Sequence, residues 1–399
     1  MLEKEDGMSI AEFPIIDVDT HLTEAKDLWT SRAPAKWKDR VPQVKLVEGR
    51  EAWVLDGKVI AGMRAHSSVL PDGGKTSGIQ ATINAYDDVH PASYDMKERL
   101  RLMDQWGIWA SILYPNLLGF GGGVMAQFDP ELKMVCARIW NDAMAEIQEE
   151  SGGRIRGMGL IPWWEPEAIL PEIQRCYDMG IRGVNTNPNP HDMGLPTLDH
   201  AMWAPMFDLC GDLDLSVNFH IGSSDDARDW FGKAAWPTLA DDVRLAIGGI
   251  MVTMSNGNAI ANLILSGICE RHPKTRFVSV ESGASWIPYL LEGLDYSAKE
   301  MMPESAGNLS MLPSEYFKRQ IYACFWFESR HLAHTIEQVG EDNLMFETDF
   351  PHPTCLYPNA RETLQKSLAG IAPSVQRKLA FENAARLYHI ALPQLAQPA

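Results

Sequence analysis

Acidic and imidazole side chains follow four short apolar runs of the chain, and this repeated pairing is the feature best suited to chemistry. The runs cover residues 13–16, 215–219, 276–280 and 344–348, and the residues at their ends are, in chain order, Asp17-x-Asp19-x-His21, His220, Glu281 and Asp349. In a barrel of parallel strands, the C-terminal ends of the strands meet on one face, where such folds carry out their chemistry. The four runs therefore predict a metal site on that face.

These residue types favour a transition metal. Neutral imidazole and carboxylate groups together suit zinc, manganese, iron or cobalt, whereas calcium takes mainly oxygen ligands. Because every second side chain of a strand points to the same face, we expect Asp17, Asp19 and His21 to share one face. By itself Asp-x-His is a weak motif, and Asp17 alone would more often cap a strand end. The other three strand ends make the metal site the stronger interpretation.

The later strand ends offer candidates for catalysis as well as for metal binding. His220 is a candidate metal ligand, although a lone histidine at a strand end is more often a packing residue. Asp349 can bind a metal and take a proton from metal-bound water. Burying Glu281 is costly unless a metal or a basic group pairs with it. A ligand, a proton carrier and a salt-bridge partner therefore remain open for Glu281.

Neighbouring residues complete the predicted site. His352, in the loop that follows Asp349, is predicted to bind a second metal, to bond a ligand, to contact the substrate or to be a polar loop residue. Asp17 is the other candidate for a second metal or for a hydrogen bond to a ligand. Trp286 and Asn218 are predicted to line the substrate pocket.

Short β-like runs alternate with longer helical patterns, which is typical of βα units around a parallel sheet. The candidate strands number about eight, as in a barrel, and cover residues 14–18, 108–113, 156–161, 181–186, 215–219, 276–280, 321–325 and 344–348. Helical patterns cover residues 131–150, 166–179, 201–212, 285–299 and 329–339. The predicted fold is α/β, a (β/α)8 TIM barrel in a single domain over residues 1–399.

Two insertions interrupt this alternation. An Asp-Gly pair at 56–57 stands between two β-like runs as a hairpin signal, so residues 22–95 are predicted to form a small β-hairpin cap over the barrel mouth. The second insertion, 222–257, carries Trp230 and Trp236 and is predicted to line the pocket or to form a subunit contact. A surface excursion with a few buried aromatic residues is the alternative.

The composition predicts a globular protein that acts on small molecules. Hydrophobic residues make up 45% of the 399 residues, enough for a large core. The net charge of −18 repels nucleic acid and anionic membranes, and no run approaches the roughly 20 apolar residues of a membrane span. The acidic start 1–6 lacks the features of a signal peptide. The six cysteines form no CxxC pair, and together these features favour the cytoplasm.

On these residues the chain resembles the amidohydrolase superfamily, in the branch that contains aminocarboxymuconate semialdehyde decarboxylase and the γ-resorcylate and 5-carboxyvanillate decarboxylases. Further matches lie at 103–108, 270–277 and 382–388, so the resemblance spans essentially the whole chain. It implies a distorted (β/α)8 barrel and usually a homodimer. It also implies a divalent metal with the ligands Asp19, His21, His220 and Asp349.

The chain departs from this branch at two strand ends. Residues 184–187 include no lysine, so a carbamylated bridging ligand is not expected. Glu281-Ser-Gly283 stands where most of the branch has His-x-Gly, whose histidine moves protons at the metal. Glu281 is therefore predicted to move protons in place of that histidine or to be a metal ligand itself.

The leading prediction is a metal-dependent hydrolase or nonoxidative decarboxylase that acts on a small aromatic or alicyclic organic acid. Zinc or manganese would be its metal, and the catalytic residues would be Asp349, Glu281 and His220. An arginine near the mouth would hold a substrate carboxylate, and the candidates are Arg156, Arg182 and Arg330.

The alternative prediction is a nonheme diiron monooxygenase that hydroxylates a larger apolar substrate at a carboxylate-rich two-metal site. Diiron sites of this ligand mixture are known, and a few relatives in the branch are similar to such enzymes. Glu281 and the aromatic insertion 222–257 favour this alternative. A binding module without catalysis is a third class, disfavoured because every acidic and imidazole position is filled.

Overall fold

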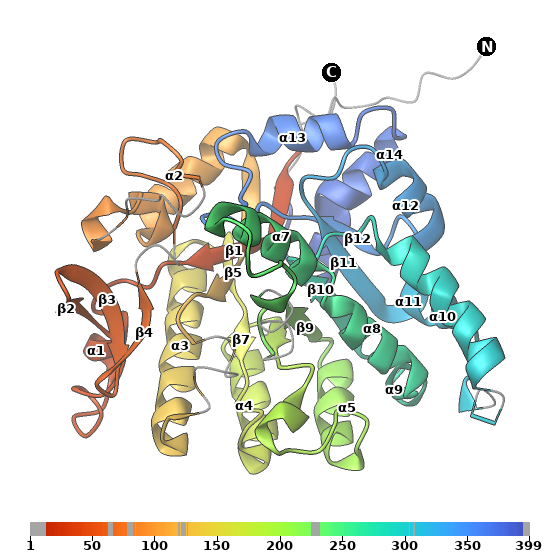
Figure 1. Ribbon diagram of the computed structural model, residues 1–399, viewed down its shortest axis with the longest axis horizontal. Helices are drawn as coiled ribbons and strands as arrows, with labels where there is room; N and C mark the ends of the chain where they lie inside the picture. Colours follow the sequence, from red (N-terminus) through yellow and green to blue (C-terminus); the bar gives the residue numbers. More distant parts are fainter. Residues whose placement is uncertain are drawn as a thin grey trace.

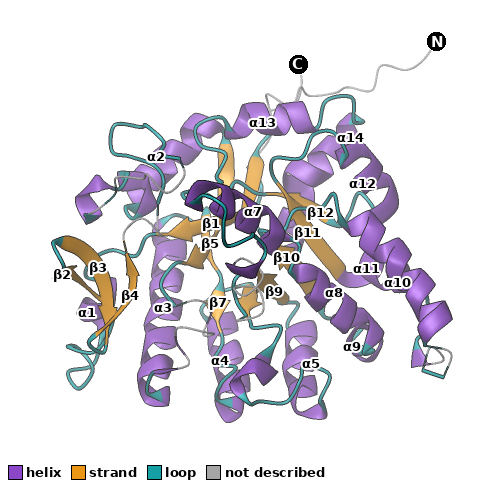
Figure 2. Ribbon diagram, in the orientation of Figure 1, coloured by secondary structure: helices purple, strands orange, loops and turns teal. Residues whose placement is uncertain are grey.

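Parallel strands lie at the centre of the computed structural model, and helices surround them (Figures 1 and 2). The structure describes residues 13–62, 67–77, 83, 85–118, 120, 125, 127–224, 232–302, 304–305 and 308–393. The alternation of parallel strands and helices confirms the predicted α/β class.

Two parallel ladders make up this central sheet. The first has the order β1-β5-β6 and the second the order β7-β8-β9-β10-β11-β12. The strands are β1 (Ile15–Leu22), β5 (Ile108–Pro115), β6 (Ile155–Gly157), β7 (Gly159–Leu160), β8 (Gly183–Asn185), β9 (Ser216–His220), β10 (Arg276–Val280), β11 (Ile321–Phe325) and β12 (Leu344–Phe346). Each of the eight predicted strands therefore forms, with the third divided at Met158 into β6 and β7.

Backbone hydrogen bonds connect β1 with the segment that follows β12. Asp349 N–H donates to the Asp19 carbonyl at 3.0 Å, and His21 N–H donates to the Phe350 carbonyl at 2.7 Å. Thr20 and Phe350 form a parallel bridge at the same place. The first and last strands of the parallel set are thus neighbours, which brings the two ends of the sequence pattern together.

A β-bulge interrupts β1 between Asp17 and Thr20. Asp17 pairs with Ser111 and Thr20 with Leu113, so β1 advances three residues while β5 advances two. One extra residue reverses the alternation of side chains along the strand. The prediction that Asp17 shares a face with Asp19 and His21 is therefore wrong.

The helices follow the strands and pack on their outer side. All five predicted helices form, with ends shifted by at most three residues. Asp95 caps α2 by accepting from Lys97 N and Glu98 N, and Gly107 ends it in the left-handed region. The helices are α1 (Leu28–Arg32), α2 (Met96–Trp106), α3 (Pro130–Glu150), α4 (Pro166–Asp178), α5 (Ala204–Asp212), α7 (Asp241–Thr253), α8 (Asn256–Leu265), α9 (Ile268–Arg271), α10 (Ile287–Met301), α11 (Pro313–Gln320), α12 (Leu332–Val339), α13 (Ala360–Ser367), α14 (Pro373–Arg377) and α15 (Asn383–Leu387).

The first insertion contains a three-stranded antiparallel sheet, β2 (Gln43–Val47), β3 (Arg50–Leu55) and β4 (Lys58–Gly62). Both residues of the Asp56-Gly57 turn have positive φ, as the hairpin signal predicts. In Figure 1 this sheet lies at the left margin, beside α1 and α3. Another part of the insertion reaches the β12 loop, because Ser68 donates to the His352 carbonyl at 2.8 Å.

The second insertion contains α7 and the first residues of α8. Trp236 is largely exposed, so it forms no buried wall in this chain by itself. Trp230, the other aromatic residue of the prediction, lies outside the described residues. Across the described ranges no helix is both long and apolar enough to cross a membrane. All six cysteines are free and buried, as expected for reduced core thiols.

Candidate metal centre

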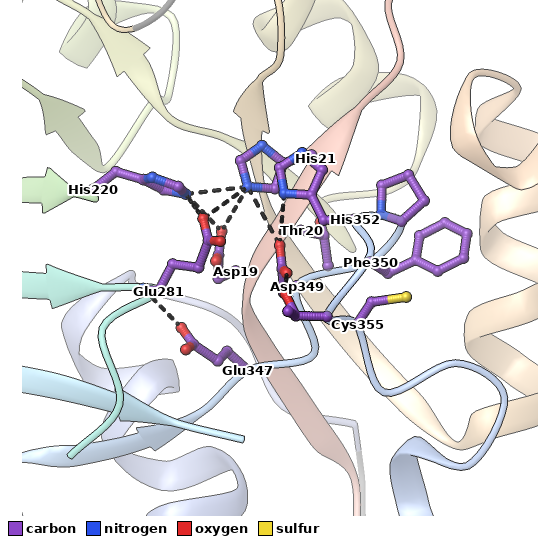
Figure 3. Close-up of polar contacts among 12 residues, drawn as sticks. Asp19, Thr20, His21, His220, Glu281, Glu347, Asp349, Phe350, His352 and Cys355 are labelled. Carbon is purple, nitrogen blue, oxygen red and sulfur yellow. Dashed lines mark hydrogen bonds and ion pairs between the residues drawn. The ribbon is translucent and has the colours of Figure 1, made fainter. Parts of the chain in front are cut away.

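Side chains from four strand ends point toward one another in Figure 3. His21 Nε2 lies 3.1 Å from His220 Nε2 and 3.6 Å from Asp19 Oδ1. His220 Nε2 lies 3.0 Å from Glu281 Oε2, and His21 Nε2 lies 3.8 Å from Asp349 Oδ1. Together with His352, whose Nδ1 lies 2.8 Å from Asp349 Oδ1, these residues form two overlapping groups of possible metal ligands. We name them the His–carboxylate cluster, which consists of Asp19, His21, His220, Glu281, Asp349 and His352.

The cluster has the donor atoms and the unmet bonding capacity that a divalent metal requires. Both Asp19 carboxylate oxygens are fully buried and lack a hydrogen-bond partner among the described residues. His220 Nδ1 lies 2.7 Å from the Ile221 carbonyl, an acceptor, so Nδ1 carries the proton and Nε2 presents its lone pair to the cluster. Ligand atoms of Asp19, His21, His220 and Glu281 all lie within 4.8 Å of one another. A divalent transition metal fits this donor set.

Two of the carboxylates sit on strained backbone. Glu281 has φ of 53° and Asp349 has φ of 58°, both in the left-handed region that residues with a Cβ rarely adopt. Each residue follows closely on a strand, β10 or β12, and the turn there redirects the side chain into the cluster. Such strain persists where surrounding contacts hold it, and it concentrates at functional sites.

Burial is the main electrostatic influence on the cluster. It raises the pKa of Asp19 and of Glu281 well above the ordinary range, and the neighbouring Asp349 charge raises both further. Burial also lowers the pKa of His21 well below its usual value. Without a cation, burial therefore favours the neutral His21 ring and the protonated Asp19 and Glu281 carboxyl groups. A bound cation would reverse this preference for the carboxylates.

Asp17 lies outside the cluster, on the other face of β1. Its Oδ1 accepts from Thr348 N at 2.9 Å and its Oδ2 accepts from Thr348 Oγ1 at 2.5 Å. Burial raises the pKa of Asp17 to about 7. The bulge turns Asp17 away from the predicted second metal, and its two bonds to Thr348 hold the strand end before Asp349 rather than a ligand side chain.

His352 lies against two members of the site. Its Nδ1 lies 2.8 Å from Asp349 Oδ1 and its Nε2 lies 2.7 Å from Asn116 Oδ1. Its ring stacks on His21 with centroids 3.8 Å apart. His352 Nε2 is engaged with Asn116, whereas Nδ1 is only within ion-pair distance of Asp349 Oδ1, an oxygen without a hydrogen-bond partner among the described residues. This geometry is compatible with both predicted roles, a ligand of a second metal and a partner of the ligand Asp349.

The two predicted pocket residues have different environments. Asn218 is fully buried, where its amide donates to the Val184 carbonyl at 3.0 Å and its Oδ1 accepts from the Tyr388 hydroxyl at 3.0 Å. These core contacts take up its amide and do not support a pocket role. Trp286 is partly buried, and its Nε1 donates to the Ser282 carbonyl in the loop that follows Glu281.

Two buried charged residues near the cluster escaped the sequence analysis. Arg99 on α2 donates to the His21 carbonyl at 2.7 Å, and its guanidinium lies 4.6 Å from the centre of the Phe350 ring. Glu347 Oε2 accepts from Glu281 N at 3.2 Å (Figure 3). The i, i+2 spacing of Glu347 and Asp349 at a strand end was a signal for Glu347. No pattern in the sequence marks Arg99 as buried.

The predicted carboxylate-binding arginines are also located. Arg156 lies near the start of β6 and Arg182 directly before β8. Both are therefore at the N-terminal end of the strands, opposite the cluster, and they cannot contact a ligand there. Arg330 is exposed in the segment between β11 and α12.

Comparison with known proteins places this cluster in a family. A family model described as amidohydrolase matches residues 16–390. The chain belongs to the amidohydrolase family. The γ-resorcylate decarboxylase of a Polaromonas species is 25% identical over 303 residues, which cover 73% of this chain and 86% of that protein.

Solved structures share the fold of this amidohydrolase. One is an amidohydrolase from Mycobacterium avium subsp. paratuberculosis, with a TM-score of 0.72, 20% identity, and coverage of 96% of this chain and 99% of that chain. Another is the 5-carboxyvanillate decarboxylase of Novosphingobium aromaticivorans, complexed with manganese and a nitrobenzoic acid. It has a TM-score of 0.66 and 17% identity over 94% of this chain and 96% of that chain. The metal-binding geometry of the cluster is consistent with a divalent metal cofactor.

Proposed function

We propose that this amidohydrolase is a nonoxidative decarboxylase of an aromatic acid that uses one divalent metal, manganese or zinc. The observation that carries the proposal is the His–carboxylate cluster at the strand ends, in a chain whose curated relatives include γ-resorcylate decarboxylases. Asp19, His21, His220 and Asp349 are the proposed ligands. A bound divalent metal would polarise the carboxylate or an adjacent phenolic oxygen of the substrate.

Glu281 is the proposed proton donor. Its side chain is 14% exposed, whereas those of Asp19 and Asp349 are 0% exposed, so Glu281 is the carboxyl group of the three that a substrate can reach. In the reaction the bond between the ring carbon and the carboxylate carbon breaks, and CO2 leaves. The proton of Glu281 forms the new C–H bond on that ring carbon, and water then returns a proton to Glu281.

Aromatic side chains pack against His220 and make this side of the cluster apolar, which suits an aromatic substrate. The Phe120 ring centre lies 4.6 Å from that of His220, and the Tyr114 ring centre lies 5.1 Å from it. Aromatic pairs at such spacings attract one another through stacked and edge contacts. Because Arg156 and Arg182 lie away from this face, the metal would attract the substrate carboxylate, and Arg330, exposed in the loop after β11, is the predicted arginine that remains on this side.

We further propose that the parallel strands close into the (β/α)8 barrel, as a single domain. The bonds between β1 and the segment after β12 support closure. Residues 67–76 contact the loop after β12, so they would form the predicted cap. The antiparallel sheet β2–β4, at the margin, would contribute less to it. A homodimer, a cytoplasmic location and a pocket or subunit contact at 222–257 remain predictions.

A two-metal oxygenase is the second candidate, and one observation favours it. The cluster divides into two overlapping groups, one with Asp19 and His220 and the other with Asp349 and His352, which share His21 and Glu281. With all three carboxylates ionised, one divalent ion leaves a net charge of −1 and two leave +1, which suits an acidic substrate better. With Glu281 protonated, as the decarboxylase requires, one divalent ion leaves the site neutral. The contact of His352 Nε2 with Asn116 leaves only Nδ1, beside Asp349 Oδ1, for a second ion.

The first experiment is elemental analysis of protein purified without added metal or chelator, followed by assay of CO2 release from 2,6-dihydroxybenzoate and 5-carboxyvanillate. About one manganese or zinc per chain, with CO2 release that Glu281→Gln lowers by about 10²–10⁴-fold in kcat, supports the decarboxylase. About two irons per chain with oxygen consumption supports the second candidate instead. One metal with no CO2 release from any aromatic acid would refute the proposed substrate class.

A further inference from the structure

The segment 281–286, between β10 and α10, has a backbone that must be held from outside. Glu281 and Gly283 both adopt the left-handed region, with φ of 53° and 67°. The N–H groups just before a helix have no carbonyl partner within that helix. The conformation that directs Glu281 into the cluster therefore depends on acceptors from other parts of the chain.

Glu328, in the loop after β11, supplies these acceptors. Its Oε1 accepts from Ala284 N at 2.6 Å and from Ser285 N at 3.2 Å. Its Oε2 accepts from Trp326 N at 3.0 Å, which fixes the carboxylate from the other side. Trp286 is the N-cap residue of α10 and makes no side-chain cap bond. Glu328 thus does from a neighbouring loop what an N-cap oxygen does within a helix.

The fit between Glu328 and the segment is close. A Cβ added at Gly283 would lie 3.0 Å from Glu328 Oε1, so both the positive φ and the carboxylate require glycine there. At the other end of the segment, Glu347 accepts from Glu281 N (Figure 3). Carboxyl groups from the β11 loop and from the end of β12 therefore hold both ends of the segment that carries Glu281.

We propose that Glu328 is a positioning residue, which holds Glu281 in the orientation that the metal site needs. This inference takes one assumption from the proposed function, namely that Glu281 faces a bound metal. Glu328 acts through the backbone of Ala284 and Ser285 and belongs to neither group of possible metal ligands. It is buried, whereas a glutamate in a loop is ordinarily exposed, which accords with a fixed role.

A double-mutant cycle on metal affinity tests the proposal. Metal-free protein is titrated with Mn²⁺ in four forms: wild type, Glu281→Ala, Glu328→Ala and the double variant. Glu281 lies in both groups of possible metal ligands and 3.0 Å from His220 Nε2, so besides giving a proton it should contribute to metal binding. We therefore expect Glu281→Ala and Glu328→Ala each to weaken Mn²⁺ binding about 10–100-fold, the range for residues that support metal ligands. In the Glu281→Ala background, Glu328→Ala should have no further effect, because the residue it positions is gone.

Matched variants separate positioning from general stability. Glu337→Ala removes an exposed carboxylate on α12, with 76% of its side chain accessible, and should leave Mn²⁺ affinity unchanged. Glu328→Gln keeps one oxygen for Ala284 and Ser285, so it should retain most of the affinity. If Glu328→Ala does not fold, Glu328→Gln and Gly283→Ala replace it in the cycle. We expect Glu328→Gln to lose less Mn²⁺ affinity than Glu328→Ala would, and Gly283→Ala to lose more.

Three results would overturn the proposal. Glu328→Ala could weaken Mn²⁺ binding equally in both backgrounds, which would show a general effect on the fold. It could leave the affinity unchanged while Glu281→Ala lowers it. Glu281→Ala could itself have no effect on Mn²⁺ binding, in which case Glu281 does not face the metal. None of these readouts depends on turnover, so they are distinct from a failure to release CO2.

Discussion

Asp17 and Asp19 are two residues apart on β1, and we predict that replacing them has opposite effects on the stability of the metal-free protein. Asp17 accepts hydrogen bonds from buried Thr348, whereas both Asp19 oxygens are buried without a partner among the described residues. Asp17→Ala should destabilise the fold and keep the metal site. Asp19→Asn should abolish metal binding and stabilise the metal-free fold.

The magnitudes follow from the bonds that each change removes. Asp17→Ala leaves the Thr348 N–H and hydroxyl without an acceptor in a buried place, at about 1–3 kcal/mol for each group. A loss of about 3 kcal/mol in the free energy of unfolding is therefore expected. Asp19→Asn removes a buried carboxylate that faces Asp349, which should raise the free energy of unfolding by about 1–2 kcal/mol.

Urea unfolding of the metal-free variants measures the stabilities, and elemental analysis after dialysis against Mn²⁺ measures the metal. The control is Asp17→Asn, whose oxygen still accepts from Thr348 N, and which should lose only about 1 kcal/mol. Loss of metal from Asp17→Ala at saturating Mn²⁺ would refute the placement of Asp17 on the outer face. A destabilised metal-free Asp19→Asn protein would refute the claim that Asp19 is held for a ligand rather than for the fold.

Three further predictions concern the metal, one buried glutamate and the thiols. Free Mn²⁺ at about 100 times its Kd should raise the free energy of unfolding by about 2.7 kcal/mol, and thermal unfolding of Asp19→Asn should show no such shift. Burial raises the pKa of Glu24 to about 8. Because this folded-state pKa exceeds the unfolded one, the wild type should lose stability relative to Glu24→Gln by about 1.4 kcal/mol per pH unit between roughly pH 4.5 and 8. A difference in urea unfolding that does not change with pH would contradict this prediction. The six cysteines are buried, so an aromatic disulfide reagent should label fewer than one thiol in the native protein and six after denaturation. Rapid labelling of Cys355 in the native state would contradict its burial.

The strand ends were predictable because each combines two independent signals. An apolar run predicts a buried strand. An acidic or imidazole residue directly after it is costly to bury unless a metal or a hydrogen-bonding group pairs with it. His220 and Asp349 followed from this argument alone, and the structure brings both to the cluster. The side chains meet because parallel strands share a direction, which the βα alternation already implied.

The face of Asp17 was not predictable from the same pattern. A period of two assigns faces correctly only while both strands advance together, and the register shift between Asp17 and Thr20 depends on how β1 pairs with β5. Glu328 and Arg99 were missed for a related reason. Each acts on the backbone of a residue distant in sequence, Ala284 for one and His21 for the other, and such contacts leave no local pattern.

These distant contacts explain how a site with three carboxylates can keep its shape before a metal binds. Once Asp19, Glu281 and Asp349 are ionised to receive a metal, their mutual repulsion would separate them if their strand ends were free to move. Arg99 fixes the His21 carbonyl, Thr354 donates to Asp349 Oδ2 at 2.6 Å, and Glu328 and Glu347 bind the Glu281 segment. The bonds that hold the ligands therefore come mostly from outside the cluster, and they fix backbone as often as side chains. Among the described residues, this arrangement leaves both Asp19 oxygens and Asp349 Oδ1 without a hydrogen bond, so they are available to a cation.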